Sequence, residues 1–118
     1  MTDNEIKEKI LDYVRKNEGT SYVEIERIFE ENSFDYKGNL EATAGKEYPN
    51  VILWSGWNKR AFDIIKELLS SGSVIRQPCQ PIVYMIDGKM LTYPIQKSSS
   101  SHNTPHWLPC AFSAKPLP

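Results

Sequence analysis

Cysteine and histidine are the side chains of this sequence best suited to hold a metal ion, and the chain has two of each. His102, His106 and Cys110 follow one another at intervals of four residues, and imidazole and thiolate groups are ligands that Zn²⁺ prefers. Cys79 is the fourth residue of this set. However, there is no C-x-x-C pair, and Pro105 breaks any helix that would align the histidines. We therefore predict no metal site.

Side chains for catalysis are equally sparse. No serine or cysteine lies in a known nucleophile motif, and there is no glycine-rich loop of the kind that binds phosphate. Both histidines lie in a Ser/Pro-rich segment, where a general base would be poorly positioned. The sequence thus predicts a protein that is not an enzyme and that needs no cofactor.

Asn58, Lys59 and Arg60 indicate a different chemistry, because they stand together at the start of an amphipathic segment. Asn can bind adenine through two hydrogen bonds, and Arg or Lys can bind guanine. Lys66 follows one to two helical turns later, and the positive N-terminal end of a helix favours phosphate. These four residues are candidates for contact with duplex DNA.

The same residues also fit an ordinary solvent-exposed helix. Lys59 and Asp63 have the spacing of many exposed ion pairs, and Asn58 or Ser55 could simply cap the helix. Asp63 and Glu67 leave the exposed face with a net charge of only +1.

Charge is distributed unevenly, although the net charge of the 118 residues is only −1. Residues 1–50 hold twelve acidic and seven basic residues, and residues 51–118 hold three acidic and seven basic residues. The second half therefore carries a net charge of +4, which could bind a polyanion or could simply be an unevenly charged surface.

The sequence has no membrane-spanning apolar run, no secretory signal and only two cysteines. We therefore expect one cytoplasmic domain without disulfides.

Apolar residues at helical spacing predict amphipathic helices over residues 3–17, 22–32 and 57–71. The first two begin with capping boxes, Thr2 with Glu5 and Ser21 with Glu24. The third has the clearest separation of apolar from polar side chains, and Gly72 ends it.

The rest of the chain is predicted to be strands and loops. Glycine and asparagine mark residues 33–50 as a loop, whereas the apolar run at 51–54 is typical of a strand. After the third helix, the Asp87-Gly88 turn predicts a hairpin. The extended segments around it cover residues 73–78, 81–86 and 89–94. Residues 96–118, with four consecutive serines and four of the eight prolines, predict an irregular tail.

This order of elements resembles a winged helix-turn-helix domain over about residues 3–94. The stretch "AFDIIKELLSSGSVIRQP" carries the resemblance, with a leucine-rich helix end, a glycine, an apolar pair and a basic residue. The resemblance implies an α+β fold of three helices with a C-terminal β-hairpin or small antiparallel sheet. It also implies that the third helix contacts DNA and that Arg76 and Lys89, on the hairpin, contact its backbone or minor groove.

The 33–55 insert between the second and third helices departs from this pattern, because three or four residues usually join them. It could block a DNA groove or form a contact surface itself. The tail residues Trp107, Leu108 and Phe112 could pack on their own domain, on a second copy in a homodimer, or on another protein. Trp54 and Trp57 most simply close the core, although an exposed tryptophan would indicate protein binding.

Two functions follow from these observations, for a domain of residues 1–95 with a tail of residues 96–118. The first is a small DNA-binding protein, acting as a regulator or accessory factor. The stretches "NVILWSGWN" and "HWLP" resemble small proteins of unassigned activity encoded by phages and pathogenicity islands of Gram-positive bacteria, which implies a mobile-element origin. The alternative is a winged helix that serves as a non-enzymatic protein–protein interaction module.

Overall fold

Local side-chain caps set the start of each of the three long helices. The computed structural model describes residues 2–96 and 104–114, and the helices it contains begin with α1 (Asp3–Lys16) and α2 (Tyr22–Glu31). Both start at the predicted capping boxes, with the hydrogen bonds formed in both directions. The third helix, α3 (Lys59–Ser70), starts at Asn58. The three predicted helices are therefore confirmed to within two residues at each end.

A small antiparallel sheet brings together strands from three distant parts of the chain. β1 (Thr20–Ser21) and β4 (Val74–Pro78) both pair with β6 (Cys110–Ala114), which lies between them. Phe112 of β6 is opposite Thr20 on one side and Arg76 on the other. The C-terminal segment is thus the centre of this sheet.

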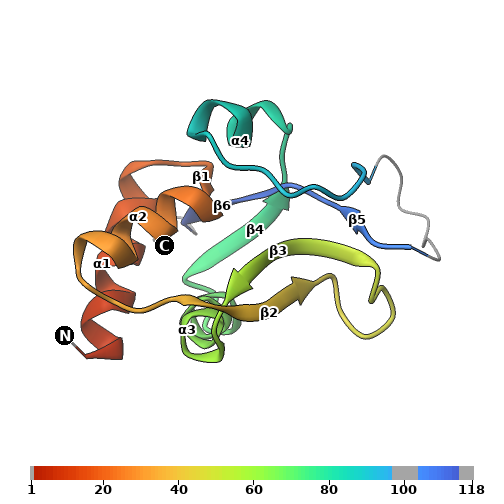
Figure 1. Cartoon of the computed structure of the whole chain (residues 1–118). Coiled ribbons are helices and arrows are strands. Elements are labelled where there is room, and N and C mark those ends of the chain that lie inside the picture. The colour runs from red at the N-terminus through yellow and green to blue at the C-terminus, as the bar shows by residue number, and fades with distance from the viewer. Residues whose placement is uncertain (1, 97–103, 115–118) are drawn as a thin grey trace.

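A second sheet is built around the insert. β3 (Val51–Trp57) pairs antiparallel with β2 (Lys37–Thr43) and parallel with β5 (His106–Trp107). Gly38 lets β2 approach the start of α3, because a Cβ atom there would lie 2.7 Å from the Asn58 Cα atom. In Figure 1, β2 and β3 run past α3, and α4 (Ile82–Asp87) lies on the opposite side of the molecule.

The predicted hairpin around Asp87-Gly88 is wrong. Residues 82–87 form the helix α4, and Gly88 caps its end with a φ of 84°. The N–H groups of Gly88 and Lys89 both donate to the carbonyl of Tyr84, at 2.9 and 3.2 Å. A glycine in the left-handed conformation is found both in tight hairpin turns and at the C-terminal end of helices. The Asp-Gly pair therefore does not distinguish a hairpin from a helix end.

Two further expectations fail because strand pairing depends on distant partners. Residues 37–43, expected in a loop, form β2 against β3, with register shifts that accommodate the turn-forming residues. Residues 106–114, expected in an irregular tail, supply β5 and β6. The Ser-rich run at 98–101 lies outside the described residues.

Aromatic side chains join the two sheets into one core. Tyr22 stacks on Trp54 with ring centroids 5.7 Å apart and meets Phe112 edge-on at 4.9 Å. Trp54 also contacts Trp107, so one cluster spans α2, β3, β5 and β6. The result is a compact α+β domain of four helices and two three-stranded sheets, counted over the described ranges. None of the described helices has the length and apolar character needed to cross a bilayer.

Candidate interaction surfaces

Asn58 has an internal role at the start of α3. Its Oδ1 atom accepts a hydrogen bond from the Ala61 N–H at 2.9 Å, and its Nδ2 atom donates to the Asp35 carbonyl at 2.8 Å. The side chain therefore caps α3 and ties it to the chain that leads into β2. To contact a DNA base, the Asn58 side chain would have to break these two hydrogen bonds.

Lys59 and Arg60 are exposed but paired. The side chain of Lys59 is 81% exposed and lies 2.6 Å from Asp63, the ion pair that the spacing indicates. Arg60 lies 2.6 Å from Asp3 of α1, and its guanidinium is 4.4 Å from the centroid of the Phe34 ring. Exposed ion pairs contribute roughly 0–1 kcal/mol, so both cations could exchange these partners for phosphate.

Lys66 is the remaining candidate on α3. It is exposed, and no ion pair joins it to an acidic residue in the described part of the chain. Nearby, Lys7 of α1 forms an ion pair with Glu67. The outer face of α3 therefore has alternating charges, not a continuous basic surface.

Arg76 and Lys89, the two DNA contacts expected on a wing, lie apart from each other, and both side chains bind residues of their own domain. Arg76 on β4 donates to the hydroxyl of Tyr22 at 3.2 Å, and burial raises the pKa of Tyr22 to about 12. Lys89, just after α4, lies 2.7 Å from the buried carboxylate of Glu26. Of the six residues predicted to contact DNA, three are exposed on α3 (Lys59, Arg60 and Lys66), and the first two of these form ion pairs. Asn58, Arg76 and Lys89 donate hydrogen bonds within the chain.

A groove lies between α3 and β2, on the flank of the helix that was expected to contact DNA. We call it the α3–β2 groove; it encloses about 470 Å³. Apolar side chains from both elements line it together with three basic and two acidic residues. The sequence does not indicate this groove, because it predicts a loop at residues 37–43, where the structure has a strand beside α3.

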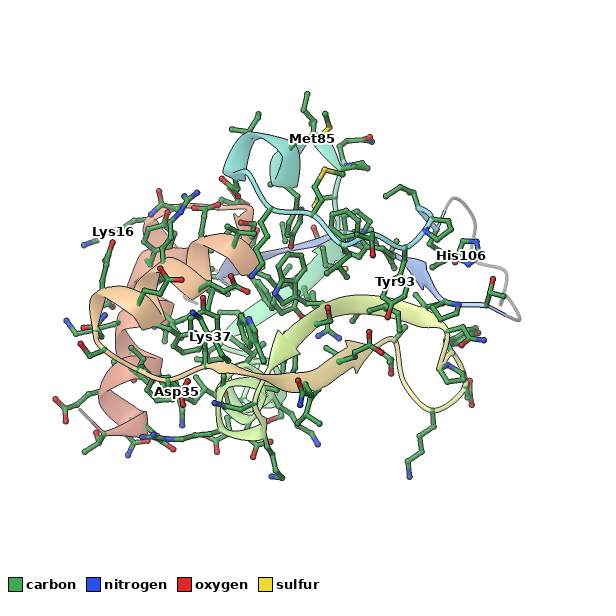
Figure 2. All side chains as sticks on the ribbon, viewed as in Figure 1. Lys16, Asp35, Lys37, Met85, Tyr93 and His106 are labelled. Carbon is green, nitrogen blue, oxygen red and sulfur yellow. The ribbon has the colours of Figure 1, made fainter. Side chains whose placement is uncertain are left out.

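The outer face of α4 is an exposed apolar surface. Ile82, Met85 and Ile86 share this face, and Met90 follows the helix; all four side chains are exposed. Ile86 is 78% and Met85 61% exposed, and Figure 2 shows Met85 pointing away from the body of the molecule. We call these four residues the α4 surface. These residues are spaced three and four apart in the sequence. Had the segment been predicted as a helix and not as a strand, this spacing would have indicated the α4 surface.

The aromatic residues considered for partner binding are placed differently. Trp54, Trp57, Trp107 and Phe112 are buried in the core, and Leu108 is half-buried. In this conformation the tryptophans and Phe112 contact their own domain and present no surface to a partner. The α4 surface is therefore the better candidate for contact with another protein.

The residues considered for zinc do not form a cluster in the described structure. Cys110 is buried in β6, and Cys79 is half-buried just after β4. The Nδ1 atom of His106 lies 2.9 Å from the Thr104 carbonyl. His102 lies outside the described residues. Within residues 2–96 and 104–114, no three His, Cys, Asp or Glu side chains are placed to hold a metal ion.

Comparisons with protein-family models, curated proteins and solved structures find no significant match. Any assignment of function therefore depends on the surfaces of this chain.

Proposed function

We propose that this chain is a non-enzymatic protein–protein interaction module built on a winged-helix-like scaffold. The scaffold is supported by the order of α1, α2 and α3, with β4 directly after α3. β4 pairs antiparallel with a returning strand, as the strands of a wing do, although that strand is β6. The segment between β4 and β6, where a wing would project, includes α4 and β5.

The observation that carries the proposal is the exposure of the α4 surface. Helices on protein surfaces normally turn their apolar side toward the core, whereas α4 exposes three apolar side chains and buries only Tyr84. Contiguous exposed apolar surface of this kind is typical of sites that bind other proteins.

The charges beside the α4 surface are already neutralised within the chain. Asp87 accepts a hydrogen bond from the Ser21 hydroxyl at 2.5 Å and lies near Arg27, while Lys89 pairs with Glu26. A partner would therefore meet an apolar centre without a free charge to desolvate, the arrangement found at the centre of protein interfaces.

DNA binding is the second candidate function, and the exposure of Lys59, Arg60 and Lys66 favours it. In that role the protein would be a regulator or accessory factor of a mobile element, as its resemblances imply. We rank DNA binding second for two reasons. Asn58, Arg76 and Lys89 form hydrogen bonds within their own domain. Asp63 and Glu67 also place negative charge on the outer face of α3.

Site-specific photo-crosslinking tests the protein-binding proposal. Benzoylphenylalanine would replace Ile86 in the cells that produce this protein. It should form a covalent adduct with another protein, in an amount that saturates, whereas the same group in place of Lys16 of α1 should not. Ile82→Ser combined with Met85→Ser should abolish the adduct at Ile86 without unfolding the domain. Equal adducts from both positions, or none from either, would contradict the proposal.

Fluorescence anisotropy with duplex DNA tests the second candidate in parallel. DNA binding would be salt-dependent and would fall in the double variant Lys59→Ala/Arg60→Ala, because phosphate contacts dominate such affinity. We expect no binding at low salt. Salt-sensitive binding that this variant weakens would reverse the ranking of the two functions.

A further inference from the structure

We infer that the α3–β2 groove binds a small amphipathic carboxylate, a molecule with an apolar body and one anionic group. The inference does not depend on the proposed function, because no residue of the α4 surface lines the groove. α3 and α4 also lie on opposite sides of the molecule (Figure 1).

The walls of the groove suit an apolar ligand body. Phe62, Ile65 and Leu69 follow one another along the flank of α3, and Leu40 and Ala42 of β2 face them. The ring of Phe62 stacks on the buried Trp57 with centroids 5.0 Å apart, which holds this wall in place. The volume of about 470 Å³ lies within the range of roughly 300–1,000 Å³ usual for small-molecule sites.

The charges of the groove favour an anionic group. Of the five charged residues that line it, Lys59 and Asp63 neutralise each other at 2.6 Å, which leaves Glu41, Lys66 and Arg76. The carboxylate of Glu41 accepts a hydrogen bond from the Tyr93 hydroxyl at 2.7 Å. The net charge of the lining is therefore +1, and neither Lys66 nor Arg76 forms an ion pair among the described residues.

Arg76 is placed to bind a carboxylate directly. It is half-buried, and none of the ion pairs among the described residues includes it. The hydrogen bond that one of its Nη atoms donates to the neutral hydroxyl of Tyr22 leaves other N–H donors of the guanidinium for a ligand. Because a guanidinium can bind a carboxylate through two parallel hydrogen bonds, Arg76 would orient the ligand, with Lys66 as the second cation.

Titration with probes of matched length tests this site. Octanoate, octylammonium and octan-1-ol would be added to the full chain, with amide chemical shifts followed by NMR. Octanoate should shift amides of α3 and β2 and bind at least about tenfold more tightly than octylammonium, since the two differ in the sign of their charge. From butyrate through hexanoate to octanoate, each added methylene should lower the Kd about two- to fourfold.

Matched variants separate the site from general hydrophobic binding. Lys66→Gln and Arg76→Gln should each weaken octanoate binding about tenfold, whereas Lys16→Gln, on α1 away from the groove, should leave it unchanged. Lys66 is exposed, so its variant reports on binding even if Arg76→Gln lowers stability through the lost bond to Tyr22. Equal affinity for octanoate and octylammonium, or shifts confined to α4, would overturn the inference.

Discussion

Glu26 accepts a hydrogen bond from the indole N–H of Trp57 at 2.8 Å, although its carboxylate is buried beneath α2. Trp54 donates to the same oxygen at 2.9 Å, and Lys89 binds the other oxygen at 2.7 Å. Three donors thus stabilise one buried carboxylate and connect α2 to β3 and to the segment that follows α4. The contact explains why an acidic residue is tolerated in the core.

Removing this acceptor should destabilise the whole domain. Glu26→Ala leaves two buried indole N–H groups without their acceptor, and we expect it to lower the free energy of unfolding by roughly 2–5 kcal/mol. Glu31→Ala, at an exposed position of the same helix, should change it by less than about 0.5 kcal/mol. Urea denaturation followed by tryptophan fluorescence measures both. Similar losses in the two variants would show that the Glu26 contacts contribute little.

Shortening the chain should show whether the C-terminal segment belongs to the domain. A chain that ends at residue 95 lacks β5, β6 and the buried Trp107 and Phe112, and it leaves β1 and β4 without their common partner. We expect it to be unfolded, with poor dispersion of amide proton shifts and no cooperative thermal transition. A cooperative transition in this shortened chain would instead support residues 1–95 as an independent unit.

Tyr84 and Ile86 provide a direct test of the helix α4. The Tyr84 hydroxyl donates to the Cys110 carbonyl at 2.5 Å and accepts from the Tyr22 N–H at 3.2 Å, whereas Ile86 is exposed. Tyr84→Phe should therefore lower the free energy of unfolding by about 1–3 kcal/mol. Ile86→Ser should lower it by less than about 0.5 kcal/mol. The opposite ranking in thermal or urea unfolding would mean that Ile86 is the buried residue.

Alkaline pH should weaken folding through Tyr22. Burial raises the pKa of Tyr22 to about 12, whereas an unfolded tyrosine titrates near ~10. Below about pH 10 the phenol is protonated in both states, so its contribution to stability is fully present. As the pH rises from about 10 to 12, the unfolded state loses its proton first, and up to about 2–3 kcal/mol of stability is lost.

Urea midpoints at pH 8 and near pH 11.5 measure this loss. Tyr22→Phe should lose less stability than the unaltered chain over this interval, because it cannot release that proton. Part of the loss should persist in the variant, since burial also raises the pKa of Tyr84. An identical loss in both chains would show that Tyr22 ionises as readily in the folded state as in the unfolded state.

Local interactions explain what could be predicted from the sequence. The capping boxes at Thr2 and Ser21 and the end of α3 before Gly72 depend on residues within one or two helical turns. The ion pair between Lys59 and Asp63 is also local, and it forms as its spacing indicates. Exposure of Lys66 follows in the same way from the amphipathic pattern of α3.

The sequence by itself determined the three long helices, their caps and the acidic and basic residues on their outer faces, because each depends on neighbours close in the chain. Only the tertiary structure decided the roles of residues 37–43, 82–87 and 106–114. Residues 37–43 and 106–114 become strands through pairing with other segments of the chain. Residues 82–87 carry the β-branched and aromatic side chains typical of a strand, but they form a helix whose buried Tyr84 hydrogen-bonds to Cys110 and Tyr22. The same long-range packing buried the tail aromatics, exposed the α4 surface and formed the α3–β2 groove.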